Sequence, residues 1–115
     1  MNTTDALFES HVPGLELLGR GKVRDIYAVD DDHLLIVTTD RLSAYDVVMP
    51  DPIPGKGRVL TQISLFWFSM MADLVPNQLT DLTVDDVVSD PGIAAPLRDR
   101  SLVVKRLKPL PIEAV

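Results

Sequence analysis

The chain has 115 residues, enough for one small domain, and 46% of them are apolar, so a real hydrophobic core is expected. It contains no cysteine, which excludes a disulfide scaffold, a thiolate nucleophile and a cysteine zinc site. The net charge of −6 argues against non-specific binding to nucleic acid or to anionic membranes. A phosphorylated small molecule is not excluded, because a few local cations can bind one inside an acidic protein.

The two ends of the chain carry different information. Residues 1–6 lack the basic and apolar regions of a secretory signal, and the longest apolar runs, Val47–Met49 and Leu65–Phe68, are too short to span a bilayer. We therefore expect a cytoplasmic protein with no membrane partner. Pro111–Val115 reads as the opening of a strand, so we expect a sequence that stops within a larger protein. A short C-terminal edge strand is the alternative.

The first third of the chain predicts an antiparallel meander. Thr4–Ser10 could form one or two helical turns, and Leu15–Leu18 is a short apolar strand. Lys22–Val29 alternates with period two, which places Asp25 on the same face as Tyr27. After an acidic turn, His33–Thr39 is a continuous apolar run and reads as a strand buried on both faces.

The middle of the chain predicts one clear helix. Thr39–Asp46 is a polar loop, Val47–Met49 a possible short strand, and the proline-rich Pro50–Gly57 cannot be regular structure. Arg58–Val75 then carries an amphipathic stripe, and Pro76 ends it. The stripe consists of Leu60, Ile63, Trp67, Met70, Met71 and Leu74. We interpret Trp67, with Phe66 and Phe68 beside it, as part of the core and not as a base-stacking platform.

The last third predicts a second helix and a strand. Asp81–Ser89 is a weak helix with Thr83 as its N-cap and acidic residues in its first turn. Pro91–Pro96 reads as a loop, and Ser101–Leu107 as a strand. The fold class is therefore α+β, with an antiparallel sheet and one main helix.

A glycine-rich turn is the first candidate site. Gly19 and Gly21 lie between two predicted strands, whereas dinucleotide and P-loop motifs need a following helix. Such a turn can lie over a triphosphate, because its N–H groups approach phosphate oxygens without a Cβ in the way. Lys22 and Arg24 would add charge-assisted hydrogen bonds. An ordinary hairpin with exposed basic residues is the alternative.

Two polar segments follow. In the loop after the buried strand, Arg41 suits a phosphate or carboxylate, while Asp40 and Asp46 suit magnesium or a ribose. The alternative is an Asx-turn with a surface Arg–Asp pair. Lys56 precedes the main helix, whose N-terminus attracts anions, although a flexible lead-in is equally consistent with the sequence.

Val103–Pro109 is a buried strand that turns polar, and it could read adenine through its backbone, with apolar walls from its neighbours. The alternative is a strand end with solvated basic residues. No catalytic triad, zinc motif or acid–base carboxylate pair is present in the sequence, and His11 and His33 lack metal-ligand spacing. The visible chemistry is phosphate handling.

Taken in order, these segments resemble one enzyme family, SAICAR synthetase (phosphoribosylaminoimidazole-succinocarboxamide synthase) of de novo purine synthesis. The segments are Gly21–Tyr27, Thr39–Asp46, Pro52–Gly57, Phe66–Phe68, Val103–Arg106 and Pro111–Val115. Each segment alone is moderately specific, whereas the ordered set is highly specific and covers Leu15 to the end.

The resemblance implies a fold and a reaction. The fold would be ATP-grasp-like, with residues 1–115 as its N-terminal ATP-binding lobe and a larger C-terminal lobe absent from this sequence. The reaction would join L-aspartate to carboxyaminoimidazole ribonucleotide through an acyl phosphate, with ATP and Mg²⁺ as cofactors. A possible homo-oligomer and no nucleic-acid partner complete this expectation.

The resemblance also implies site residues. ATP would be bound by Gly21, Lys22, Val23, Arg24, Lys105, Arg106, Leu107 and Glu113. The ribonucleotide and its metal would be approached by Asp40, Arg41, Ser43, Asp46 and, more weakly, Lys56. No metal ligand is certain within these 115 residues, because the family's acidic magnesium ligands and its Arg-Gly-Tyr and Gly-Ser segment lie beyond the strand begun by Pro111. The chain alone is therefore expected to be inactive.

Two other classes remain as alternatives. A kinase-like small lobe also has a glycine flap between strands, but its Val-Ala-x-Lys strand and helix glutamate are not evident. A non-enzymatic nucleotide- or partner-binding module would use an open sheet edge and the apolar helix stripe.

Overall fold

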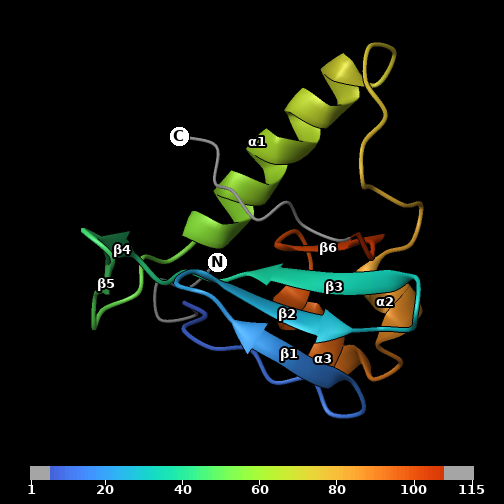
Figure 1. Cartoon of the computed structure of the whole chain (residues 1–115). Coiled ribbons are helices and arrows are strands. Elements are labelled where there is room, and N and C mark those ends of the chain that lie inside the picture. Colours follow the sequence, from blue (N-terminus) through green and yellow to red (C-terminus); the bar gives the residue numbers. More distant parts are fainter. Residues whose placement is uncertain (1–5, 108–115) are drawn as a thin grey trace.

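A computed structural model describes residues 6–107 of the chain. Four antiparallel strands form the main sheet in the order β1-β2-β3-β6 (Figure 1). They are β1 (Glu16–Arg20), β2 (Arg24–Ala28), β3 (His33–Thr38) and β6 (Ser101–Lys105). The α+β class and the meander are confirmed, while Glu113 and the strand expected at Pro111–Val115 lie outside the described residues.

Side-chain alternation gives the sheet two different faces. On β2, Asp25 and Tyr27 are buried on the inner face, as the period-two pattern predicts. Leu35 and Val37 of β3 and Val103 of β6 continue this inner face. The residues between them belong to the outer face, where Ile26 pairs with Ile36 and Ile36 pairs with Leu102 across the ladder.

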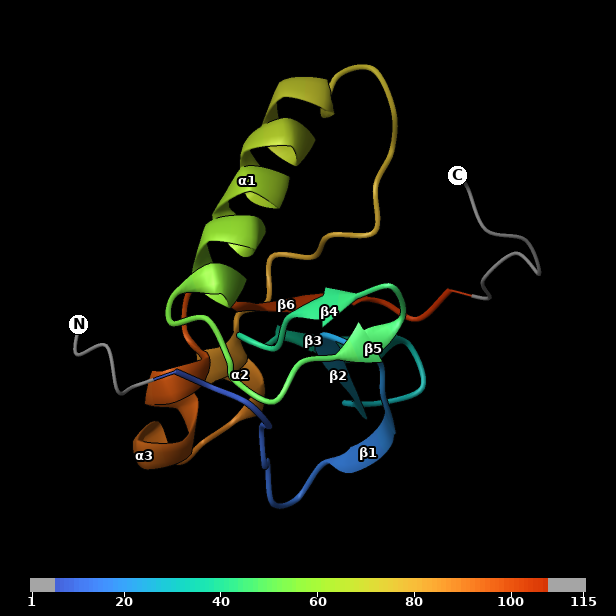
Figure 2. The same cartoon turned by 90° about the vertical axis from the view of Figure 1, so that its left-hand side faces the viewer.

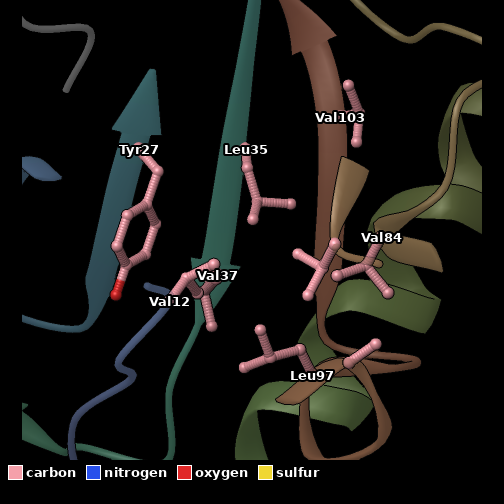
Figure 3. Close-up of a cluster of buried hydrophobic side chains, with 9 residues drawn as sticks. Val12, Tyr27, Leu35, Val37, Val84, Leu97 and Val103 are labelled. Carbon is pink, nitrogen blue, oxygen red and sulfur yellow. The ribbon is translucent and has the colours of Figure 1, made fainter. Parts of the chain in front are cut away.

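The core lies against the inner face of the sheet. Two short helices cover this face, α2 (Val84–Val87) and α3 (Pro91–Ala94), the second continuing into a 3₁₀ turn at Ala95–Leu97 (Figure 1). Val84 and Leu97 from this layer belong to one buried cluster with Leu35, Val37 and Tyr27 (Figure 3). The sheet is thus sealed on one side by the helices that lead into β6.

The main helix lies on the opposite side of the sheet. Helix α1 (Lys56–Met71) starts close to β3 and then rises away from the sheet (Figure 2). Its stripe is consequently exposed, with Trp67 54% and Met70 60% accessible. Phe66 is 57% exposed, so the interpretation of Phe66 and Trp67 as core residues is wrong for this structure. Amphipathic periodicity identifies the apolar face of a helix but not the surface that covers it.

Two other expectations differ from the structure. Residues 6–10 form no helix, because Leu7 and Ser10 donate their N–H groups to the carboxylates of distant aspartates. Pro91–Pro96 is mostly helical and not a loop. Asp90 caps it by accepting from the Gly92 N–H, and Pro91 stands at the start, where a missing N–H costs nothing.

The remaining elements agree with the sequence in kind. Helix α2 is capped by Thr83, as expected, and Asp86 completes a capping box. The loop after β3 contains a separate hairpin of β4 (Ser43–Ala44) and β5 (Val47–Val48), which lies beyond one end of the main sheet (Figure 1). No helix in residues 6–107 is long and apolar enough to cross a membrane.

Candidate functional site

The glycine-rich turn joins β1 to β2 at one end of the sheet. Arg20 pairs with Asp25, and the Gly21 N–H donates to the Arg24 carbonyl at 2.7 Å, which closes the turn. Gly21, Lys22 and Arg24 are exposed, and Val23 is half-buried. The four residues expected to bind ATP phosphates therefore form one compact turn, open to solvent on its outer side.

Arg41 lies beneath this turn. Its guanidinium donates to the carbonyls of Gly21 and Lys22, both at 3.0 Å, and pairs with Asp25 at 2.9 Å. The residue is only 4% exposed. Sequence reasoning expected Arg41 to contact a substrate directly, whereas this placement favours a structural role behind the turn.

Asp25 is a site residue that the sequence analysis did not single out. Burial alone would raise its pKa, but hydrogen bonds from Ser10 and Arg41 outweigh this and hold the pKa below its ordinary value. Arg20 also pairs with Asp25, at 2.7 Å. A signal was available in the sequence: an aspartate on the same strand face as Tyr27 must be buried, and a buried carboxylate needs partners.

Asp40 is fully buried next to Arg41. It accepts from the N–H groups of Leu7 and Gly57 and forms an ion pair with Arg100 at 2.9 Å. Burial would raise the pKa of Asp40, yet Arg100 and the two N–H groups lower it below the usual value. In this structure Asp40 ties the loop to the start of α1, and its side chain does not face solvent.

Lys22 and Asp46 are brought together by the tertiary structure. Asp46 lies at the tip of the β4–β5 hairpin, where it forms an ion pair with the Lys22 ammonium. The hydrogen bond that Lys22 donates to Asp46 in this pair lowers the pKa of Asp46. Ser43 stands in β4, half-buried and paired with Val48. One expected phosphate ligand and one expected substrate ligand thus occupy a single exposed edge.

The outer face of the sheet borders a cavity beside the turn. This cavity of about 210 Å³ lies between this face and α1. Arg24, Ile36, Thr38 and Leu102 line it from the sheet, and Phe68 from the helix. Arg24 therefore connects the turn to a cavity whose lining is mixed, with Ile36, Leu102 and Phe68 as apolar members and Thr61, Ser64 and Gln78 as polar ones.

The strand end expected to read adenine borders a second cavity. Lys105 and Leu107 line a groove of about 600 Å³, together with Phe68 and Met71 of α1. The Lys105 N–H donates to the Gln78 carbonyl at 2.8 Å, so an edge of β6 is already covered. The Arg106 N–H donates to the Asp32 carbonyl at 2.7 Å.

Lys56 lies at the start of the main helix and does not line either cavity. Lys56 is the first residue of α1, directly after Gly55 in a left-handed conformation. Within residues 6–107, no three acidic or histidine side chains are grouped so as to hold a metal ion.

The fold and the site define a class: an α+β lobe with a glycine-rich hairpin turn at the end of an antiparallel sheet, and with a cavity between the outer sheet face and the main helix. Such a surface suits a phosphorylated ligand with an aromatic base. Within that class, the chain belongs to the SAICAR synthetase family, whose family model matches residues 17–115.

Relatives support this membership. The phosphoribosylaminoimidazole-succinocarboxamide synthase of Thioalkalivibrio sulfidiphilus is 64% identical over 95% of this chain, which spans 37% of that relative's length. The synthase of Methylococcus capsulatus is 56% identical over 100% of the chain, which spans 39% of that relative. The chain thus corresponds to rather more than a third of these ligases of purine biosynthesis.

Solved structures agree. A SAICAR synthase superimposes with a TM-score of 0.85 at 44% identity, covering 92% of this chain and 39% of that one. The enzyme from Saccharomyces cerevisiae, solved with SAICAR, gives a TM-score of 0.81 at 44% identity, with coverages of 88% and 37%. A type-2 SAICAR synthetase in complex with ADP shares the fold, with a TM-score of 0.59 at 20% identity over 77% of this chain and 33% of that one.

Proposed function

We propose that this chain supplies the ATP-binding lobe of a ligase that joins L-aspartate to carboxyaminoimidazole ribonucleotide, giving SAICAR, ADP and phosphate. Family membership over residues 17–115 is the observation that carries this proposal. The open glycine-rich turn, with Lys22 at its tip, supports it independently. The expected route transfers the γ-phosphoryl group to the substrate carboxylate, after which the aspartate amine displaces phosphate and forms the amide.

The residues have separate roles in this proposal. Gly21–Arg24 would hold the ATP phosphates, and Lys105–Leu107 would border the adenine. Ile36 and Leu102, which the sequence analysis did not name, would form part of the apolar wall. Glu113, which lies outside the described residues, would contribute on the ATP side.

The ribonucleotide would lie near the β4–β5 hairpin. Asp46 is a candidate for contact because it is exposed beside Lys22. Ser43, in β4 of the same hairpin, is the second candidate. Asp40 and Arg41 would act by shaping the loop, since both are buried. Lys56 stays a weaker candidate for the substrate phosphate.

The cofactor, the location and the assembly belong to the same proposal. Magnesium would arrive with the ATP phosphates and neutralise charge on them. Further acidic ligands would have to come from outside residues 6–107, given the absence of a grouped set within them. We also propose a cytoplasmic enzyme that can form a homo-oligomer, with small molecules as its ligands and no nucleic-acid or membrane partner. The 115-residue chain by itself is expected to be inactive, because it spans only 37% of a relative's length.

The test measures ADP release by the full-length protein that the gene encodes. If that protein has the length of its relatives, ADP release should depend on both L-aspartate and carboxyaminoimidazole ribonucleotide. Lys22→Ala should raise the KM for ATP about tenfold or more, since it removes a charged phosphate contact.

Arg98→Ala is the matched control. Arg98 pairs with Asp85 on the surface, and this exposed pair should leave the KM for ATP unchanged. If a protein as long as its relatives releases ADP without needing L-aspartate or the ribonucleotide, the ligase assignment is refuted. An unchanged KM for ATP in Lys22→Ala would refute the role of the turn.

A further inference from the structure

Arg41 lies behind the glycine-rich turn, and we propose that it is a positioning residue that aims the N–H groups of Lys22 and Val23 at phosphate oxygens. That the bound phosphates belong to ATP rests on the proposed function, whereas the orientation of the turn does not. The proposal moves Arg41 from the substrate side of the site, where the sequence placed it, to the support of the nucleotide side.

The contacts of the Arg41 guanidinium are almost all internal. Nε donates to the Lys22 carbonyl at 3.0 Å, and one terminal nitrogen donates to the Gly21 carbonyl at 3.0 Å and to Asp25 at 2.9 Å. The other terminal nitrogen donates to the Phe8 carbonyl at 2.7 Å. Because a guanidinium has five N–H donors, these four bonds leave little for a ligand.

Because of peptide-bond geometry, these contacts also fix the direction of the neighbouring N–H groups. In a trans peptide the carbonyl of one residue and the N–H of the next point in opposite directions, and the described residues contain no cis bond. When Arg41 draws the carbonyls of Gly21 and Lys22 inward, the N–H groups of Lys22 and Val23 must point outward. Among the described residues, neither of these two N–H groups has a hydrogen-bond acceptor.

A neighbouring residue completes the support. Thr39 donates to the Val23 carbonyl from its N–H at 3.0 Å and from its hydroxyl at 2.8 Å. The carbonyls of Gly21, Lys22 and Val23 are therefore all held from behind. Successive outward N–H groups of this kind form an anion-binding concavity, and preorganising it removes an ordering cost from binding.

The choice of arginine follows from this geometry. A planar guanidinium reaches two adjacent carbonyls and a carboxylate at once, whereas a lysine ammonium is a point donor. Asp25 balances the buried charge and is itself fixed by Ser10 at 2.6 Å. Arg41→Lys should therefore keep the charge pair with Asp25 but release at least one of the turn carbonyls.

The experiment compares wild type, Arg41→Lys and the surface control Arg98→Lys in the protein as its gene encodes it. Steady-state kinetics give kcat and the KM values for ATP, L-aspartate and the ribonucleotide. Amide NMR during titration with inorganic tripolyphosphate then follows Lys22 and Val23 directly, without any need for turnover.

In wild type, tripolyphosphate should shift the Lys22 and Val23 amide signals more than those of β3. In Arg41→Lys these shifts should shrink, and the KM for ATP should rise about tenfold, the loss typical of one weakened charged hydrogen bond. The KM for L-aspartate should stay at its wild-type value, and Arg98→Lys should match wild type throughout. If Arg41 were needed only for folding, Arg41→Lys would instead lower kcat and shift amide signals over the whole sheet.

Three results would overturn the proposal. One is a wild-type titration in which the Lys22 and Val23 amides do not respond, and this test stands even if Arg41→Lys does not fold. Another is an Arg41→Lys protein with an unchanged KM for ATP. The third is a rise in the KM for the ribonucleotide alone, which would mean that Arg41 touches that substrate. If amides respond but no aspartate-dependent turnover occurs at the relatives' length, the ligase assignment fails while the positioning role stands.

Discussion

Single residues decide how closely the loop after β3 approaches the main helix. Gly57 lies in the first turn of α1, and its N–H donates to Asp40 at 2.8 Å. A Cβ at this position would meet the Thr38 carbonyl oxygen at 2.2 Å and the Thr39 carbonyl oxygen at 2.8 Å. Both obstacles are backbone atoms, which cannot swing aside as a flexible side chain would. Gly57 is thus required for close packing and not for an unusual φ angle.

Gly57→Ala should therefore destabilise the fold. We expect a loss of about 1–3 kcal/mol, the range typical of overpacking, because either α1 or the end of β3 must shift. Urea unfolding followed by circular dichroism measures this. Gly19→Ala is the matched control, since a Cβ there meets no atom within 4 Å. Equal unfolding midpoints for the two variants would contradict the close approach.

At the scale of elements, periodicity predicted the strands of the sheet well. Strands β2 and β3 pair in register from Arg24–Thr38 to Ala28–Leu34, as the meander requires. The main helix was also predicted, but it runs from Lys56 to Met71 and not from Arg58 to Val75. Its early end is a tight turn, in which the N–H groups of Leu74 and Val75 both donate to the Met71 carbonyl.

Helix α1 leads to a prediction about the only tryptophan of the chain. Trp67 is 54% exposed and packs edge-to-face on Phe66, with ring centroids 5.4 Å apart. In the 115-residue chain its fluorescence should lie close to that of the urea-unfolded chain and should be quenched readily by acrylamide. A blue-shifted and protected emission that persists on dilution would show that this face of α1 is covered.

At the scale of the whole molecule, two buried aspartates connect segments that are far apart in the sequence. Asp25 joins the segment before β1, through Ser10, to the loop after β3, through Arg41. Asp40 joins the same loop to the start of α1 and, through Arg100, to the entry of β6. Sheet, helix and N-terminal segment should therefore lose structure together.

This arrangement predicts a loss of stability in acid. The pKa values of Asp25 and Asp40 are held below the ordinary 3.8, against the opposing effect of burial. A lowered folded-state pKa stabilises the fold above the unfolded value, and this stability disappears as pH falls through the folded-state pKa. The urea midpoint should stay level near neutral pH and drop steeply below about pH 4.

Asp25→Asn tests the source of that drop. The variant should be less stable at neutral pH by about 3–5 kcal/mol, because Arg41 is left as a buried charge without its partner. Its further loss in acid should be smaller than that of wild type. Asp85→Asn, which alters an exposed pair with Arg98, should keep the wild-type profile. An acid loss of the same size in Asp25→Asn would place its origin elsewhere.

The sequence by itself determined the local features of this protein: the period-two strands, the glycine-rich turn, the capped helix at Thr83 and, through ordered motifs, the family. These follow from neighbouring residues, whose spacing sets backbone conformation directly. Only the tertiary structure decided that Asp40 and Arg41 are buried and that the apolar face of α1 is exposed. Burial and pairing depend on residues distant in the sequence, such as Gly21 and Asp25 around Arg41, and local patterns do not specify those contacts.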